Sequence, residues 1–131
     1  MLRTLQLFTI RQKIDVITDH YNTPTLTNNL AQVIGEAVEK DLNGLYHASG
    51  AERISRYHFA EKIAQKFNLA KNQIKPTKMK NLENSGTWLA KRPPDSSLET
   101  SKIQNQITTK LFNVNEALEA MKKEETDAAL N

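Results

Sequence analysis

The sequence has no cysteine among its 131 residues, and its apolar runs are short. Without cysteine there are no disulfides, thiolate metal sites or thiol nucleophiles, and the chain suits a reducing, cytoplasmic compartment. No run approaches the roughly 18 to 20 apolar residues that span a bilayer, so we expect no membrane partner. Residues 1–11 mix apolar and polar side chains and end in no small-residue cleavage site, which predicts no signal peptide.

Glycine is also scarce, with four in the whole chain. No Gly-x-Gly-x-x-Gly turn and no Gly-Lys-Ser/Thr loop is present, so the chain offers no phosphate-cradling loop for a dinucleotide cofactor. The three histidines lie in separate segments without metal-ligand spacing, which predicts no metal site. The net charge of +3 is too small to indicate a nucleic-acid partner.

What is present is the composition and patterning of one globular domain. Its content is 38% hydrophobic and 25% charged, which is ordinary for a soluble domain of this length. Apolar spacing predicts helices over residues 2–12, 28–40 and 56–67, and alternation predicts strands over 13–19 and 45–48. Residues 20–25 carry turn chemistry and are expected to form a loop. The alternating order of helices and strands indicates an α/β fold.

The second half of the chain has weaker signals. Residues 74–77 are expected to form a short strand, residues 78–86 resemble a linker with turns over 81–87, and residues 98–103 lead into a helical turn. Asn113 is expected to cap a last helix, followed by a frayed polar tail over residues 123–131. Other boundaries are also predicted: Thr27 or Asn28 as a helix cap, Asn43-Gly44 as a left-handed stop, and Ser55 as the next cap.

Arg92 is the most suggestive single residue. The proline that follows it favours an extended backbone, and its planar guanidinium suits bidentate binding of a phosphate. The alternative is a surface arginine paired with Asp95 or Glu99. Asp19 at the end of the first strand either faces a cleft or bonds its own turn, and the turn is favoured from position alone. Trp88 either packs or stacks on a base, and packing is the more common role.

Five motifs, in order over about residues 3–122, resemble one family. Asp19 to Thr25 is similar to Asp-Gln-x-Gly-x-Pro-Thr, Leu30-Ala31 to the helix start after it, and Gly44 to Gly50 to Gly-x-Tyr-His-x-Ser-Gly. Ser55 to Ala60 is similar to Ser-x-x-x-Phe-Ala, and Arg92-Pro93 with Leu98 to Lys102 to Arg-Pro followed by Leu-x-Thr-x-Lys. The chain thereby resembles the C-terminal half of the dTDP-4-dehydrorhamnose reductases, extended short-chain dehydrogenases.

The resemblance implies a partial α/β sheet with flanking helices over residues 1–122, the substrate-binding part of a Rossmann-type fold. In the family, the N-terminal half binds NADPH and supplies a catalytic Tyr-x-x-x-Lys pair. This chain has neither motif, because Tyr57 is followed by Glu61 at the fourth position and by Lys62 at the fifth. We therefore expect no catalytic or cofactor-binding residues and no reductase activity from this chain alone.

The resemblance also implies a role in binding a dTDP-4-dehydro-6-deoxysugar. In related sugar-nucleotide epimerases, an Arg and an Asp spaced like Arg92 and Asp95 contact the diphosphate and the ribose. The loop containing Tyr21, Pro24 and Thr25 is implied as a second part of the cleft.

Two partners and two other functions follow as expectations. In the family, residues 44–48 form an edge of the Rossmann sheet. We therefore expect a separate N-terminal Rossmann half or self-association to complete it. The alternative function is a noncatalytic regulatory subunit, since the methionine adenosyltransferase regulatory subunit resembles the same family. A nucleic-acid adaptor using residues 71–91 is the third.

Overall fold

The computed structural model describes residues 13–86 and 91–129, so the helix predicted over residues 2–12 lies outside the described part. The chain divides into two compact units. The first unit comprises the described parts of Met1–Asn22 and Ile54–Ser96, and the second comprises those of Thr23–Arg53 and Ser97–Asn131. Each unit combines two separate stretches of chain. None of the described helices meets the length and hydropathy needed to cross a membrane.

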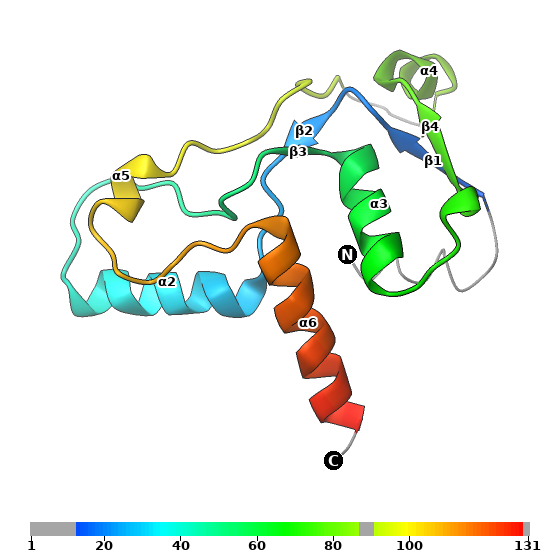
Figure 1. Cartoon of the computed structure of the whole chain (residues 1–131). Coiled ribbons are helices and arrows are strands. Elements are labelled where there is room, and N and C mark those ends of the chain that lie inside the picture. Colours follow the sequence, from blue (N-terminus) through cyan, green and yellow to red (C-terminus); the bar gives the residue numbers. More distant parts are fainter. Residues whose placement is uncertain (1–12, 87–90, 130–131) are drawn as a thin grey trace. The chain divides into compact units, whose positions relative to one another are not determined.

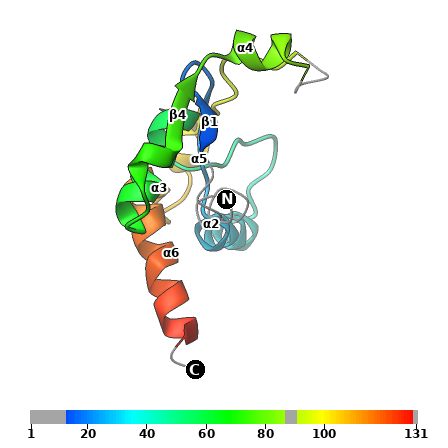
Figure 2. The ribbon, with the colours of Figure 1, turned by 90° about the vertical axis from the view of Figure 1, so that its right-hand side faces the viewer.

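The first unit is built on two parallel strands, β1 (Ile14–Ile17) and β4 (Ile74–Thr77). Both lie within segments where the sequence predicted a strand. Figures 1 and 2 both show these strands side by side, with α3 (Arg56–Lys66) against them. A short 3-10 turn, η1 (Lys71–Gln73), leads into β4. Ala60 and Ala64 of α3 are buried against Ile74, and partly buried apolar side chains complete the core: Ile14, Val16, Tyr57 and Leu69.

A second, very short ladder pairs β2 (Tyr21–Asn22) with β3 (Ile54–Ser55) in antiparallel register. The loop predicted over residues 20–25 is therefore wrong at its first positions, because Tyr21 and Asn22 pair with a distant segment. β3 runs directly into α3, where the Oγ of Ser55 accepts the backbone N–H of His58 at 3.2 Å. This confirms Ser55 as the helix cap.

The segment expected to contain turns over residues 81–87 instead contains helix α4 (Met79–Asn84). Lys78 occupies the N-cap position of this helix, and its side chain forms no capping hydrogen bond. Asp19 takes that role from a distance, since its Oδ1 accepts the backbone N–H of Met79 at 2.9 Å. A carboxylate at a helix N-terminus satisfies an otherwise unpaired donor and complements the helix dipole. The bond described for Asp19 is thus to α4 and not to its own turn.

The second unit contains α2 (Thr27–Glu39), α5 (Ser101–Gln104) and α6 (Val114–Ala129). Its core joins Val33 of α2, Ile103 of α5 and Leu111, with Tyr46, Ala48 and Ile107 packed around them. Asn113 caps α6 as predicted, because its Oδ1 accepts the backbone N–H of Glu116 at 3.0 Å. The helix continues to Ala129, through most of the predicted polar tail.

The predicted boundaries of α2 are both displaced. Leu26 occupies the N-cap position without a side-chain bond. Asn28, one of the two expected caps, instead donates to Glu124 at 2.7 Å. At the other end, Asp41 takes the left-handed backbone (φ 49°) expected of Asn43-Gly44. The backbone N–H groups of Asp41 and Leu42 then bond the last turn of the helix, which is a Schellman stop with Asp in the usual place of glycine.

The strand predicted over residues 45–48 is wrong. These residues form no strand in the described chain, and Leu45 is 77% exposed. Lys102 fixes the segment instead. Its Nζ donates to the carbonyl of Leu45 at 2.7 Å and lies 4.4 Å from the centre of the Tyr46 ring. A sequence pattern that is typical of a strand therefore forms no sheet where no neighbouring strand is present.

A pair of glycine substitutions tests the packing of the second unit. A Cβ on Gly50 would lie 2.0 Å from the carbonyl oxygen of Pro24, whereas a Cβ on Gly35 in α2 meets nothing within 4 Å. We expect Gly50→Ala to lower the free energy of unfolding by about 1–3 kcal/mol or more, because backbone must move. Gly35→Ala should raise it by about 0.4–1 kcal/mol. Urea denaturation measures both, and equal stabilities would contradict the described contact.

Candidate functional site

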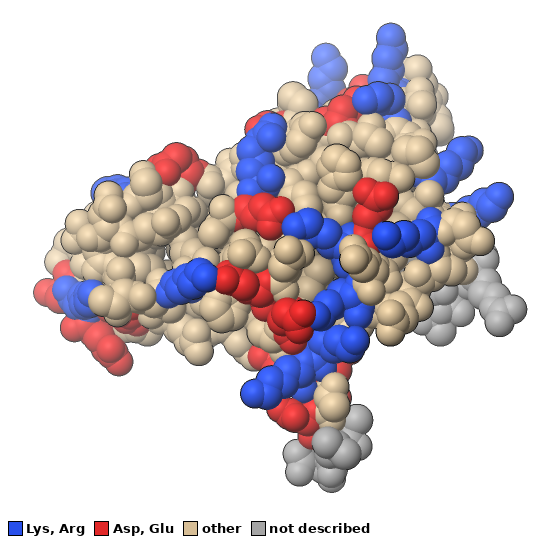
Figure 3. Space-filling model, viewed as in Figure 1, with Lys and Arg blue, Asp and Glu red and all other residues tan. Residues whose placement is uncertain are grey.

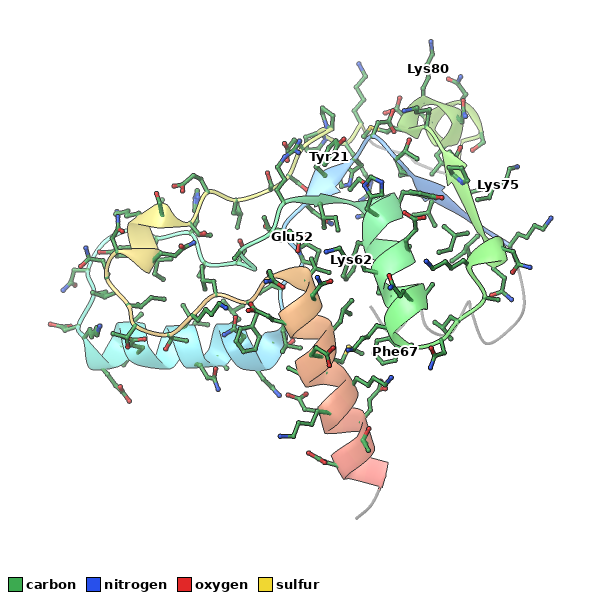
Figure 4. The ribbon with its side chains drawn as sticks, viewed as in Figure 1. Tyr21, Glu52, Lys62, Phe67, Lys75 and Lys80 are labelled. Carbon is green, nitrogen blue, oxygen red and sulfur yellow. The ribbon has the colours of Figure 1, made fainter. Side chains whose placement is uncertain are left out.

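The backbone of Tyr21 brings two distant segments together in the first unit. On one side Tyr21 pairs with Ser55 of β3, and on the other it forms an isolated parallel bridge with Asp95. Its N–H donates to the carbonyl of Pro94 at 2.9 Å, and its carbonyl accepts the N–H of Ser96 at 3.0 Å. Figure 4 shows Tyr21 on β2, beside β3. The segment that carries Arg92 and Asp95 is therefore fixed next to the start of α3.

His20 and Arg56 form the side-chain centre of this region. The imidazole of His20 is buried, at 4% exposed, and its Nδ1 accepts the Nε–H of Arg56 at 3.0 Å. The carbonyl of His20 also accepts the backbone N–H of Arg56 at 3.0 Å. An imidazole that accepts at Nδ1 is neutral and carries its proton on Nε2. His20 therefore anchors Arg56 by both its ring and its backbone.

The charges of two arginines act on this ring. Burial lowers the pKa of His20, and the guanidinium groups of Arg56 and Arg92 lower it further, against smaller opposing effects of Asp95 and Asp19. Partial burial lowers the pKa of Arg56, and the Arg92 guanidinium adds to this effect. Both arginines thus act on the same point in the unit. Phosphate or carboxylate oxygens are the groups that such a pair of guanidinium groups binds.

The five predicted binding residues do not fall in one unit. Tyr21, Arg92 and Asp95 lie in the first unit, where backbone bonds bring them together. Pro24 and Thr25 lie in the second. The hydroxyl of Thr25 donates to the carbonyl of Thr23 and accepts the N–H of Gly50, both at 3.0 Å. In this structure Thr25 therefore fixes the loop that packs on Gly50.

Sequence reasoning missed Arg56 and His20 as site residues. A signal for Arg56 was available, since it opens α3 directly after the cap Ser55, where the helix dipole disfavours a cation. An arginine at that position favours a nearby anion. His20 had no such local signal, because its partner lies 36 residues away.

The described residues do not fit a nicotinamide dinucleotide. Such a cofactor needs a glycine-rich turn between a strand and a helix, where backbone N–H groups meet the pyrophosphate. In this structure β3 continues into α3 without a glycine, and β4 reaches α4 through Lys78. Gly35 lies inside α2, and Gly50 is packed against Pro24.

The surface charges are mixed. On the face seen in Figure 3, basic and acidic side chains lie interspersed among uncharged ones. This distribution agrees with the small net charge of +3. Anion recognition on this face therefore depends on local geometry and not on a broad positive field.

Solved structures with a similar fold include two dTDP-4-dehydrorhamnose reductases. A dTDP-4-dehydrorhamnose reductase from Bacillus anthracis str. Ames, in complex with NADP, has a TM-score of 0.82 and 24% identity, covering 94% of this chain and 42% of the reductase. A dTDP-4-dehydrorhamnose reductase ortholog from Clostridium acetobutylicum has a TM-score of 0.77 and 23% identity, covering 99% and 43%. The α/β fold class predicted from the sequence is confirmed.

The family follows from a direct match. The model of the RmlD substrate binding domain matches residues 1–126. The chain therefore belongs to this family, as its motifs predicted. It spans less than half the length of the two reductases.

The chain is also similar to relatives that are not named as reductases. Methionine adenosyltransferase 2 subunit beta of Rattus norvegicus is 30% identical over 93 residues, which cover 66% of this chain and 26% of that protein. The protein of the same name from Danio rerio is 30% identical over 86 residues, covering 62% and 25%. The chain spans about a quarter of these relatives.

The buried His20 predicts a pH-dependent stability. A histidine whose pKa is lowered on folding stabilises the folded state fully above its unfolded value of about 6.5. That stability is lost as the pH falls below this value, because the unfolded chain binds the proton more readily. We expect urea midpoints of the wild type to fall between pH 7.5 and 5.5, and His20→Asn to reduce this difference.

The matched control is His58→Asn on the exposed side of α3 in the same unit. It should retain the pH difference, because the buried imidazole remains. An equal loss in both variants would contradict the assignment to His20.

Proposed function

We propose that the chain binds the diphosphate-containing part of a dTDP-4-dehydro-6-deoxysugar, as the substrate-binding part of an NADPH-dependent dTDP-4-dehydrorhamnose reductase-like protein. Membership of the RmlD substrate binding domain family supports this assignment. The observation that carries it is the backbone pairing of Tyr21 with Pro94 and Ser96. This pairing fixes the segment of Arg92 close enough for its charge to act on His20 and Arg56.

In this proposal, the residues have different roles. Arg92 binds phosphate oxygens through its guanidinium, and Asp95, held by its bridge to Tyr21, accepts a hydrogen bond from a ribose hydroxyl. Tyr21 contributes by fixing that segment. Pro24 and Thr25 are proposed as further substrate-binding residues, on the loop that they form against Gly50 within the second unit.

The proposal assigns binding and not reduction to this chain. Reduction of a carbonyl requires a hydride donor and a proton donor. In the proposal, both come from outside this chain, because its strand-to-helix junctions lack the glycine-rich turn and its sequence lacks a Tyr-x-x-x-Lys pair. The contribution of the chain is then to orient the nucleotide sugar.

Substitution of Arg92 tests the phosphate contact. We expect Arg92→Ala to weaken binding of dTDP by about tenfold to a hundredfold, since a charge-assisted hydrogen bond contributes about 1.5–3 kcal/mol. Isothermal titration calorimetry measures the dissociation constant. The control is Lys91→Ala, an exposed cation one residue away. Equal affinities of Arg92→Ala and the wild type would show that Arg92 does not bind the phosphate.

A second candidate function is regulation through protein contact. The relatives named methionine adenosyltransferase 2 subunit beta favour it, and the second unit has an apolar groove of about 380 Å³. The groove is lined by α2 together with Tyr46 and Ala48, and its lining residue Val38 is 75% exposed. Leu45, next to Tyr46 in the chain, is 77% exposed. Apolar surface of this kind is typical of an interaction site. The same surface is where we propose that a Rossmann half or a second copy is bound.

Size-exclusion chromatography tests the proposed contact. We expect the isolated chain to elute above its 14.9 kDa mass, and the double variant Val38→Glu/Leu45→Glu to elute as a monomer, because a charge in an apolar contact is costly. Lys123→Glu, an exposed position on α6, is the control. A monomeric wild type that retains a methionine adenosyltransferase in a pull-down would favour the regulatory role over self-association.

A further inference from the structure

The position of Arg56 is electrostatically unfavourable, and a purely structural role does not explain it. It is the first residue of α3, an 11-residue helix without an acidic side chain in its first turn. The N-terminal end of a helix carries partial positive charge from the aligned peptide dipoles, so a cation is disfavoured there and an anion is favoured. The Arg92 guanidinium adds a further positive charge that acts on Arg56. A bound anion would relieve both repulsions.

The side chain of Arg56 is also held in one orientation. Its Nε donates to Nδ1 of His20 at 3.0 Å, and its backbone N–H donates to the carbonyl of the same residue. Because His20 is buried, this anchor is fixed by the core of the unit. The terminal Nη groups of Arg56 make no hydrogen bond or ion pair to any residue that the structure describes. An arginine held at Nε keeps these donors available for a pair of anionic oxygens.

We propose that Arg56, oriented by His20, is a second phosphate-binding residue that shares a diphosphate with Arg92. Arg56 contacts the phosphate oxygens directly, whereas His20 is a positioning residue that acts through Arg56. This inference rests on the proposed function, in which Arg92 binds the diphosphate. It adds a second guanidinium group, which the motifs of the sequence did not indicate.

The experiment measures binding of dTDP and of inorganic pyrophosphate to the full chain by calorimetry. We expect Arg56→Gln to weaken both by about tenfold or more, because a charged hydrogen-bond donor is lost. The control Lys75→Gln removes the same charge from an exposed side chain on β4 of the same unit (Figure 4). It should change either affinity by less than about twofold, since a distant exposed charge is screened.

Two substitutions of His20 separate positioning from simple stability. His20→Asn supplies an amide oxygen that can accept from Nε of Arg56, so its dTDP affinity should stay within about threefold of wild type. His20→Leu removes the acceptor and should weaken dTDP binding as Arg56→Gln does. Circular dichroism establishes that each variant is folded. If His20→Asn binds as weakly as His20→Leu while both are folded, the positioning role is wrong.

The outcomes also distinguish this inference from the proposed function. If Arg92→Ala weakens dTDP binding and Arg56→Gln does not, the inference is overturned and the proposed function stands. If Arg56→Gln weakens pyrophosphate binding but the wild type binds dTDP no more tightly than pyrophosphate, the inference stands and nucleotide recognition is contradicted. If the wild type binds neither ligand, both are overturned.

Discussion

The backbone of Tyr21 is the point on which the first unit depends. This residue pairs with Ser55, 34 positions further along the chain, on one side and with Asp95, 74 positions further along, on the other. Backbone hydrogen bonds are directional, so they fix the register of both segments as well as their proximity. Arg56 and Arg92 act on the same buried imidazole as a result. Two residues of strand thus position the charged groups of the candidate site.

Most of the regular elements were predictable from local patterns. The apolar stripes of α2 and α3 and the alternating residues of β1 each carry their own periodic signal. The pair β2 and β3 has no such signal, because a two-residue strand is too short for alternation. Residues 45–48 show the reverse error. Their composition favours a strand, but a strand also requires a neighbour, which the sequence pattern does not contain.

The sequence predicted only the part of the candidate site where a residue restricts the backbone of its own neighbour. Proline after Arg92 restricts the backbone, and that restriction is visible in the sequence. The bond of Arg56 to His20 and the bond of Asp19 to α4 join residues 36 and 60 positions apart. Such contacts depend on the completed fold. The division into two units was not predictable for the same reason, because each unit combines two stretches that are distant in the sequence.

Glu36 in the second unit has a consequence for how this family can vary. Its carboxylate accepts from Lys40 at 2.8 Å and from the backbone N–H groups of Thr108 and Thr109 at 2.6 and 2.7 Å. These donors lower the pKa of Glu36, with Lys40 the largest contributor. Loss of one donor leaves the others paired, whereas loss of the acceptor leaves the backbone N–H groups of Thr108 and Thr109 without this partner at once. Evolutionary drift should therefore be free at the donor side chains and slow at position 36.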